Sequence, residues 1–154
     1  MKTYTSENGW FSMELPVSWE EYDCGEDGAY AFFDTNSWTG NLRIIPFRLA
    51  RRRNPSKDIA SIFIQDEVLK NEGANRIQLG DFDCAHFRKN IQQDDGDLFV
   101  YYWITGIGNN LFICTFTVDH KQEKCEQHST DLETVQNILQ SIRMKQSVEK
   151  LNAA

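Results

Sequence analysis

Hydrophobic and polar residues alternate over short stretches of the first third of the chain, which is typical of β-strands. Every second residue of Phe11–Leu15 is apolar, and successive residues of a strand point to opposite faces. Pro16 ends this strand because proline cannot donate to a sheet ladder. Trp19 follows as a large apolar body that covers the strand end. The same pattern predicts further strands at Glu21–Cys24, Tyr30–Asp34 and Gly40–Leu49.

A helix is predicted over Ser56–Glu72. Ser56 is a good N-cap, and Gly73 lies just past the predicted end. On a helical wheel one arc carries the large apolar side chains, so we expect this arc to face the core. Its members are Ile59, Ile62, Phe63 and Leu69.

The third part of the chain predicts an antiparallel meander of three long strands after a short one. The turns between the long strands are predicted at Asp95-Gly96, with type I′ geometry, and at Gly108-Asn109-Asn110. A sheet with one wet face alternates apolar with polar residues, whereas the last strands are apolar on both faces. We therefore expect cover on both faces, at least at the centre. The predicted strands are Arg76–Leu79, Phe82–Ile91, Leu98–Ile107 and Leu111–Val118.

A second helix, Thr130–Ile142, can cover one face of this sheet while the first helix covers the other. Thr130-Asp131-Leu132-Glu133 has the pattern of a capping box at its start. Its apolar stripe consists of Leu132, Val135, Ile138, Leu139 and Ile142. The sequence thus predicts an α+β fold with a central antiparallel sheet of about six to eight strands and one main helix on each face.

Length and composition indicate an ordinary globular protein. A chain of 154 residues is most simply one domain, here with a core over residues 10–143 and a polar tail over 144–154. A net charge of −7 argues against general nucleic-acid binding, which needs a basic surface. No apolar run is long enough to cross a membrane, and the first residues lack a secretion signal, so we expect a cytoplasmic protein. The four cysteines form no C-x-x-C pair, which favours reduced thiols.

The order of elements and two short motifs resemble one known superfamily. The opening Phe11–Trp19 follows an aromatic-x-hydrophobic-x-x-Pro-x-x-Trp pattern, and Leu139–Ile142 ends the last helix with hydrophobic-x-Ser-hydrophobic. The chain is similar to PsbP-like proteins, which include the photosystem protein PsbP, the Ran-release factor of nuclear import and bacterial DcrB-like proteins, and it looks like an uncharacterised bacterial member. The resemblance implies an antiparallel sheet between helices and a protein-binding role, with no catalytic motif and no cofactor.

Two exposed features are candidate partner-binding sites. Arg51, Arg52 and Arg53, with Arg48 and Lys57 nearby, form a basic cluster that could hold an acidic partner or phosphate, or be a solvated loop. Trp10 and Trp38 lie at strand ends or in loops and are the tryptophans expected to be exposed. A concave surface lined by Phe99, Tyr101 and Trp103 could alternatively receive a ligand, although core packing is the simpler interpretation of these rings.

Two sets of residues could carry catalysis. Cys84 and His86 share a strand face, as a thiolate nucleophile and its base would, but a packed cysteine beside a hydrogen-bonded histidine is the favoured interpretation. Asp66 falls inside the apolar arc of the first helix, where a buried carboxylate either finds a partner or has a raised pKa. A paired or rim-exposed aspartate is the simpler expectation.

Two acidic or metal-like patterns are weaker. His120, Cys125 and His128 lie in one stretch, but their spacing matches no common zinc module, so we expect a polar loop. Asp94–Asp97 resembles half of a calcium loop and is explained by a hairpin turn. No metal ligand set is therefore predicted.

These observations favour a non-catalytic module that binds another protein as an adaptor or chaperone-like partner. The alternatives are a small-molecule binder with an aromatic-lined pocket and, less favoured, an enzyme that uses Cys84 with His86 or Asp66. The sequence predicts neither the partner's identity nor the oligomeric state.

Overall fold

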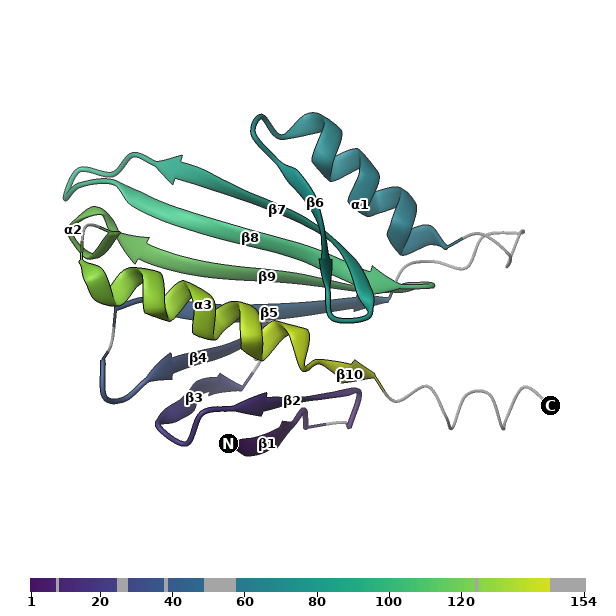
Figure 1. The fold of residues 1–154 in the computed structure, drawn as a ribbon, viewed down its shortest axis with the longest axis horizontal. Helices are drawn as coiled ribbons and strands as arrows, with labels where there is room; N and C mark the ends of the chain where they lie inside the picture. The colour runs from purple at the N-terminus through teal and green to yellow at the C-terminus, as the bar shows by residue number, and fades with distance from the viewer. Residues whose placement is uncertain (8, 25–27, 38, 49–57, 124, 145–154) are drawn as a thin grey trace.

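A computed structural model gives the fold of the chain, and it describes all residues except 8, 25–27, 38, 49–57, 124 and 145–154 (Figure 1). The strands are β1 Lys2–Thr5, β2 Phe11–Leu15, β3 Trp19–Cys24, β4 Tyr30–Asp34, β5 Asn41–Arg48, β6 Asn75–Leu79, β7 Phe82–Ile91, β8 Leu98–Ile107, β9 Asn110–Asp119 and β10 Arg143–Met144. The helices are α1 Ile59–Lys70, α2 His120–Glu123 and α3 Glu126–Gln140.

A seven-stranded antiparallel sheet forms the centre of the fold, in the order β3-β4-β5-β9-β8-β7-β6. The predicted meander is confirmed, because β7, β8 and β9 pair in sequence over nearly their whole length. Strand β5 returns to pair with β9, from Asn41 opposite Thr117 to Arg48 opposite Asn110. This register decides which side chains share a face of the sheet.

A second, three-stranded sheet, in the order β1-β2-β10, joins the beginning of the chain to the segment after α3. The predicted strand Phe11–Leu15 is its centre, and Trp19 is buried just beyond it. The Ser141 hydroxyl donates to the Ile138 carbonyl and accepts from the Glu14 N–H at 2.8 Å. The opening and closing motifs of the chain therefore meet in space, and strands β1 and β10 extend the fold to Lys2 and Met144.

The two main helices cover opposite faces of the seven-stranded sheet, as predicted (Figure 1). Helix α3 and the small sheet pack on the face that carries Trp103 and Phe116. Helix α1 packs on the other face, against Ala85 and Ile104, and its contacts are with β6, β7 and β8. The α+β fold class is therefore confirmed, with the addition that the small sheet shares one face with α3.

Helix α1 is turned differently from the prediction. The predicted N-cap Ser56 lies outside the described residues, and the cap is Asp58, whose carboxylate accepts from the Ser61 N–H at 3.1 Å. The residues of α1 that are buried are Ala60, Ile64 and Glu67. The predicted stripe is only partly right, since Phe63 packs against the core while Ile62 and Leu69 are exposed. The buried side instead uses small Ala60, which allows close approach to the sheet, and Glu67, which is bonded by Asn71 at 2.9 Å and Lys70 at 2.7 Å.

Helix α3 begins one turn before its predicted start. Its N-cap is Cys125, which makes no side-chain capping bond, so the capping box predicted at Thr130 is wrong. The predicted apolar stripe is confirmed, since Val135, Ile138, Leu139 and Ile142 are buried and Leu132 packs against them. The extra turn adds His128 to the buried side of the helix, which also carries Asp131.

The two predicted turns have different outcomes. Gly108 and Asn109 connect β8 to β9 as predicted. Gly108 has a positive φ of +65°, which the first residue of a tight two-residue hairpin loop requires. Between β7 and β8, the Gly96 N–H donates to the Gln93 carbonyl, so the turn centres on Asp94-Asp95. Neither aspartate has a positive φ, and the predicted type I′ turn at Asp95-Gly96 is therefore wrong.

Candidate functional site

The outward side of α1 carries two large exposed apolar side chains, which is unusual for a helix on the outside of a sheet. Ile62 is 48% exposed and Leu69 is 74% exposed. They are two turns apart and nearly in line, because seven residues correspond to about two turns of a helix. Asp66 lies between them and is exposed, so it is not the buried carboxylate that the wheel allowed. We call Ile62, Asp66 and Leu69 the α1 outer face.

A second region of interest lies on the opposite face of the sheet, under the start of α3. The Arg88 guanidinium donates to one oxygen of Glu123, and the Tyr101 hydroxyl donates to the other at 3.2 Å. The same hydroxyl lies 3.0 Å from Nε2 of His128. Because the one hydroxyl proton is directed to the carboxylate, Nε2 of neutral His128 is the donor to Tyr101. We call Arg88, Tyr101, Glu123 and His128 the polar cluster.

Burial shapes the protonation of this cluster. It lowers the pKa of the His128 imidazole below 6.5, an effect that Arg88 reinforces and that Glu123 and Asp131 oppose. It also raises the pKa of the Tyr101 hydroxyl above 10. Nδ1 of His128 is buried and has no hydrogen-bond partner among the described residues. The cluster therefore favours a neutral imidazole at neutral pH.

Asp131 on α3 is almost fully buried, with 3% exposure. It accepts hydrogen bonds from the Thr39 hydroxyl and, at 3.0 Å, from the Gln127 amide. Burial raises the pKa of its carboxyl above 3.8, while the bond from Gln127 lowers it. This carboxylate fixes Thr39, which stands just before β5, against the start of α3.

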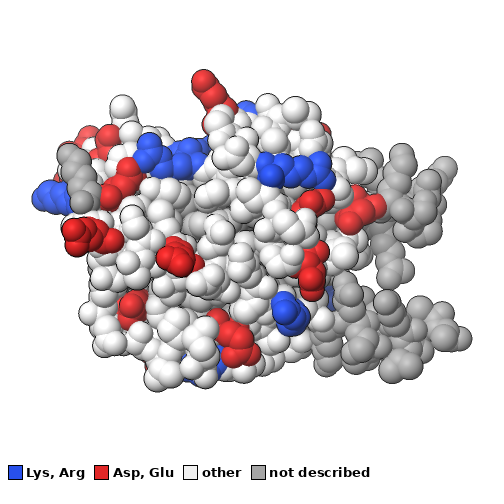
Figure 2. Space-filling model, in the orientation of Figure 1, with Lys and Arg blue, Asp and Glu red and all other residues white. Residues whose placement is uncertain are grey.

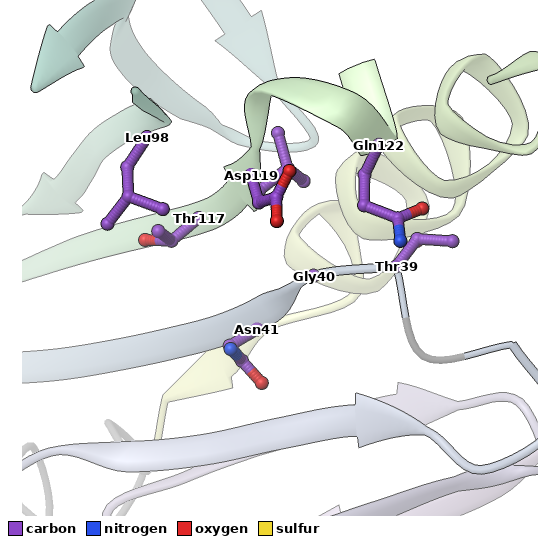
Figure 3. A pocket seen from close by; sticks show the side chains of 8 residues that line it. Thr39, Gly40, Asn41, Leu98, Thr117, Asp119 and Gln122 are labelled. Atoms are coloured by element: carbon purple, nitrogen blue, oxygen red, sulfur yellow. The ribbon is translucent and has the colours of Figure 1, made fainter. Parts of the chain in front are cut away.

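Thr39 forms one wall of a pocket at the end of the large sheet, which we call the sheet-end pocket (Figure 3). The pocket has a volume of 310 Å³ and is bounded by the start of β5, the start of β8, the end of β9 and α2. Its lining residues are Thr39, Gly40, Asn41, Leu98, Thr117, Val118, Asp119 and Gln122.

Cys84 and His86 do lie on one face of β7, but they do not form a reactive pair. Cys84 is fully buried, and burial raises the pKa of its thiol to about 12. Nδ1 of His86 lies 2.9 Å from the Tyr102 carbonyl, and its ring stacks on Trp103 at 4.7 Å. The favoured interpretation, a packed cysteine beside a hydrogen-bonded histidine, matches this geometry. The thiols of Cys84, Cys114 and Cys125 are free.

The predicted aromatic surface is mainly core. Trp103 is 1% exposed, and Phe99 and Tyr101 are partly buried against the same core. Tyr101 is engaged in the polar cluster, and the Arg88 guanidinium lies 4.7 Å from the Phe99 ring centre. None of the three rings lines the sheet-end pocket.

Of the predicted partner-binding residues, Trp10 lies in the described part of the chain. Trp10 is half-buried rather than exposed, with its ring 6.4 Å from that of Phe112 and under the Arg48 guanidinium at 5.0 Å. Trp38 and the arginines Arg51, Arg52 and Arg53 lie outside the described residues. On the side shown in Figure 2, charges of both signs are scattered among uncharged residues and form no continuous patch of either sign.

The histidines and cysteine of the predicted loop do not converge. His128 faces Tyr101 from α3, Cys125 is exposed at the helix start, and Nδ1 of His120 lies 3.9 Å from Asp119. Within the described part of the chain, no three His, Cys, Asp or Glu side chains are grouped so that they could hold a metal ion. Asp94–Asp97 forms the β7–β8 turn described above.

Several residues of the polar cluster and the pocket were not predicted from the sequence. Arg88, Thr39 and Gln122 are ordinary polar residues whose roles depend on long-range contacts. His128 and Asp131 carried a usable signal, because both fall on the apolar side of α3 once that helix is extended by one turn. A histidine and an aspartate within an apolar stripe indicate a buried polar network.

The chain matches a known family along its entire length. It belongs to the family described as a domain of unknown function, DUF3805, which matches residues 1–154. No curated protein matches the chain in sequence. The family match therefore covers the whole chain and names no activity for it.

Solved structures share this fold. A crystal structure from Bacteroides thetaiotaomicron VPI-5482 is similar with a TM-score of 0.75 and 28% identity, covering 96% of this chain and 49% of that chain. This chain thus spans about half the length of that protein. LpqN, described as involved in cell envelope biogenesis of Mycobacterium tuberculosis, is similar at TM-score 0.51 and 8% identity, covering 93% and 89% of the two chains. This second likeness shows the fold alone.

A cyanobacterial PsbP from Synechocystis sp. PCC 6803 also matches, at TM-score 0.40 and 13% identity, over 93% of this chain and 91% of that one. This match is too weak to support an argument about function. Among the helices that the structure describes, none is long and apolar enough to span a membrane.

Proposed function

We propose that this chain is a non-catalytic protein-binding module and that the α1 outer face is its contact surface. The observation that carries the proposal is the position of Ile62 and Leu69, which are 48% and 74% exposed although α1 packs on the sheet through other residues. A helix that needs only one buried side carries polar residues on the other. Apolar residues on both sides are typical of a helix that is covered twice.

The size of the surface fits a specific but modest contact. Full burial of an Ile or Leu side chain stabilises by roughly 1.5–3 kcal/mol. The exposed parts of Ile62 and Leu69 therefore offer roughly 2–4 kcal/mol to a partner that covers both, before the cost of ordering. This corresponds to a factor of about 30 to 700 in affinity.

The chemistry of the α1 outer face also favours one class of partner. Asp66 lies exposed between the two apolar side chains, in a chain with a net charge of −7. A fitting partner presents two apolar side chains about 10 Å apart, the rise of two helical turns. It places a lysine or arginine between them, opposite Asp66, because an apolar contact that left this carboxylate unpaired would be weakened. An amphipathic helix with a basic residue in its apolar stripe meets these conditions.

The properties of the candidate catalytic residues support a binding role over an enzymatic one. A thiol with a pKa of about 12 is protonated at neutral pH and is a poor nucleophile, and Cys84 is inaccessible as well. Asp66 is exposed, so it is not the buried carboxylate with a raised pKa that a general acid would need. These facts favour contact through the surface over catalysis by either of the two candidate sets.

The relative from Bacteroides thetaiotaomicron supports use of this fold as a module. Its matched part shares one chain with about as much polypeptide again, since the match covers 49% of that chain. We extend the proposal to a kinship with PsbP-like proteins, which the opening and closing motifs support. We also extend it to action in the cytoplasm, which the free thiols of Cys84, Cys114 and Cys125 support.

The test compares three versions of the full-length chain as bait in lysates of cells that naturally make it. We expect quantitative mass spectrometry to show proteins captured by the wild type and lost at least tenfold with Ile62→Ser/Leu69→Ser. Val17→Ser is the matched control, because Val17 is 70% exposed and lies in the turn after β2, away from α1. A captured protein should then bind the purified wild type directly. Equal capture by the double variant and the Val17→Ser control would refute the proposal that the α1 outer face is the contact surface.

A further inference from the structure

The sheet-end pocket is a second surface feature of the molecule, apart from the α1 outer face. The pairing of β5, β8 and β9 brings four of its strand residues to one face, since Asn41 lies opposite Thr117 and Leu98 lies opposite Asp119. Figure 3 shows Asn41 and Thr117 on the strand side of the opening and Gln122 on the α2 side. A volume of 310 Å³ is at the small end of ligand pockets, which run from about 300 to 1,000 Å³.

Hydrogen bonds hold two of the polar lining groups, Thr39 and Asp119, in place. The Thr39 hydroxyl donates to Asp131, a carboxylate that is 3% exposed and also bonded by Gln127. Asp119 accepts from the Lys121 N–H at 2.7 Å, which fixes the carboxylate at the first turn of α2. Burial of a carboxylate is costly unless hydrogen bonds compensate it. Here the buried Asp131 positions a residue of the pocket wall, which reduces the ordering that a ligand must supply.

The lining chemistry selects the class of ligand. The lining residues provide two amides, two hydroxyls and one carboxylate, from Asn41, Gln122, Thr39, Thr117 and Asp119. None of the eight lining residues is basic, so a phosphate or carboxylate would meet Asp119 without a compensating cation. Hydroxyl groups both donate and accept, and amide and carboxylate groups can bond to neighbouring hydroxyls of one molecule. Leu98 adds a small apolar wall.

We propose that the sheet-end pocket binds a neutral polyhydroxylated molecule of the size of one or two sugar rings. The apolar wall then contacts the C–H face of the ring, while the amides and Asp119 bond to its hydroxyls. This site is independent of the α1 outer face, because the N–H of Ala60 in α1 bonds to Gly108, at the end of β8 opposite to Leu98. Failure of either proposal therefore leaves the other standing.

The experiment is a titration of the full-length chain, followed by amide NMR, with a panel of neutral sugars: glucose, galactose, mannose, N-acetylglucosamine, and their methyl glycosides. We expect at least one sugar to shift the amides of Gly40, Asn41 and Gln122 with a saturable curve. Asp119→Ala/Gln122→Ala should weaken this binding at least tenfold. Gln78→Ala is the matched control, because Gln78 lies on β6, outside the pocket, and should leave it unchanged.

Three results would overturn the assignment. The first is that no sugar shifts the pocket amides at the highest soluble concentration. The second is that shifts are unchanged in Asp119→Ala/Gln122→Ala while circular dichroism shows a native fold. The third is that spermidine, used as a cationic probe, binds the pocket more tightly than every sugar, since the ligand would then be a cation attracted by Asp119. Binding by a methyl glycoside as well as the free sugar would support a ligand that is part of a longer glycan.

Discussion

The orientation of α1 can be tested by two substitutions of the same kind on one helix. Ile64 is fully buried against Ala85 and Ile104, whereas Ile62 is 48% exposed. Replacing isoleucine by alanine removes three carbon atoms, each worth about 0.8 kcal/mol when buried. At Ile64 this gives about 2.4 kcal/mol, and the cavity left behind raises the loss to about 2.5–4 kcal/mol. At Ile62 about half of the transfer loss applies and no cavity forms, which gives about 1 kcal/mol.

The difference between the variants is more informative than either value. Alanine is the better helix former at both positions, so this contribution cancels in the comparison. In urea unfolding, with a slope of about 2–3 kcal/mol per molar, Ile64→Ala should lower the midpoint by about 1 M and Ile62→Ala by less than half of that. If Ile62→Ala costs as much as Ile64→Ala, the helix is turned as its hydrophobic pattern predicted, and the α1 outer face does not exist.

Three further outcomes follow from the buried groups and from one turn. Iodoacetamide at pH 8 should label the exposed Cys125 in the folded protein and leave the buried Cys84, with a pKa of about 12, unlabelled. Peptide mapping that finds both cysteines equally labelled would contradict the burial of Cys84. Because the pKa of His128 is below 6.5 in the folded state, the unfolded chain takes up the proton first as the pH falls. The contribution of neutral His128 to stability is therefore present above about pH 6.5 and is lost as the pH falls from there. The urea midpoint should fall less steeply with decreasing pH in His128→Gln than in the wild type, and an equal pH dependence would refute this role of His128. Gly106→Ala should cost several kcal/mol, because its φ is +155° and a Cβ would lie 2.1 Å from the Asn110 carbonyl oxygen, whereas Gly108→Ala, with open space around it, should cost about 1–2 kcal/mol; similar thermal midpoints for the two variants would contradict the close approach.

The two main helices show how far a hydrophobic pattern can be trusted. The stripe of α3 was predictable because Val135, Ile138 and Leu139 are both the most apolar and the most buried residues of that helix. In α1 the pattern failed at Ile62 and Leu69, because the buried side uses Ala60, whose small size lets the helix approach the sheet, and Glu67, whose charge is compensated within the helix. A hydrophobic pattern reflects neither the small size of Ala60 nor the paired charge of Glu67.

The strands were predicted better than the way they assemble. Alternation and turn composition located β2, β4 and the β7–β9 meander, because these depend on neighbouring residues. The separate small sheet depends on Met144 pairing with Phe11 across the chain, which no local pattern contains. The sheet-end pocket is of the same kind, since Thr39, Leu98 and Gln122 meet only through the register of β5, β8 and β9.

The central claim is that the α1 outer face contacts another protein, and site-specific photo-crosslinking tests it most directly. A photo-reactive benzoylphenylalanine is placed at Leu69 or, as the control, at Val17, two positions with 74% and 70% exposure. In cells that naturally make the protein, irradiation should give a discrete covalent adduct from position 69 and none from position 17. Equal adducts at both positions, or none at position 69, would contradict the account.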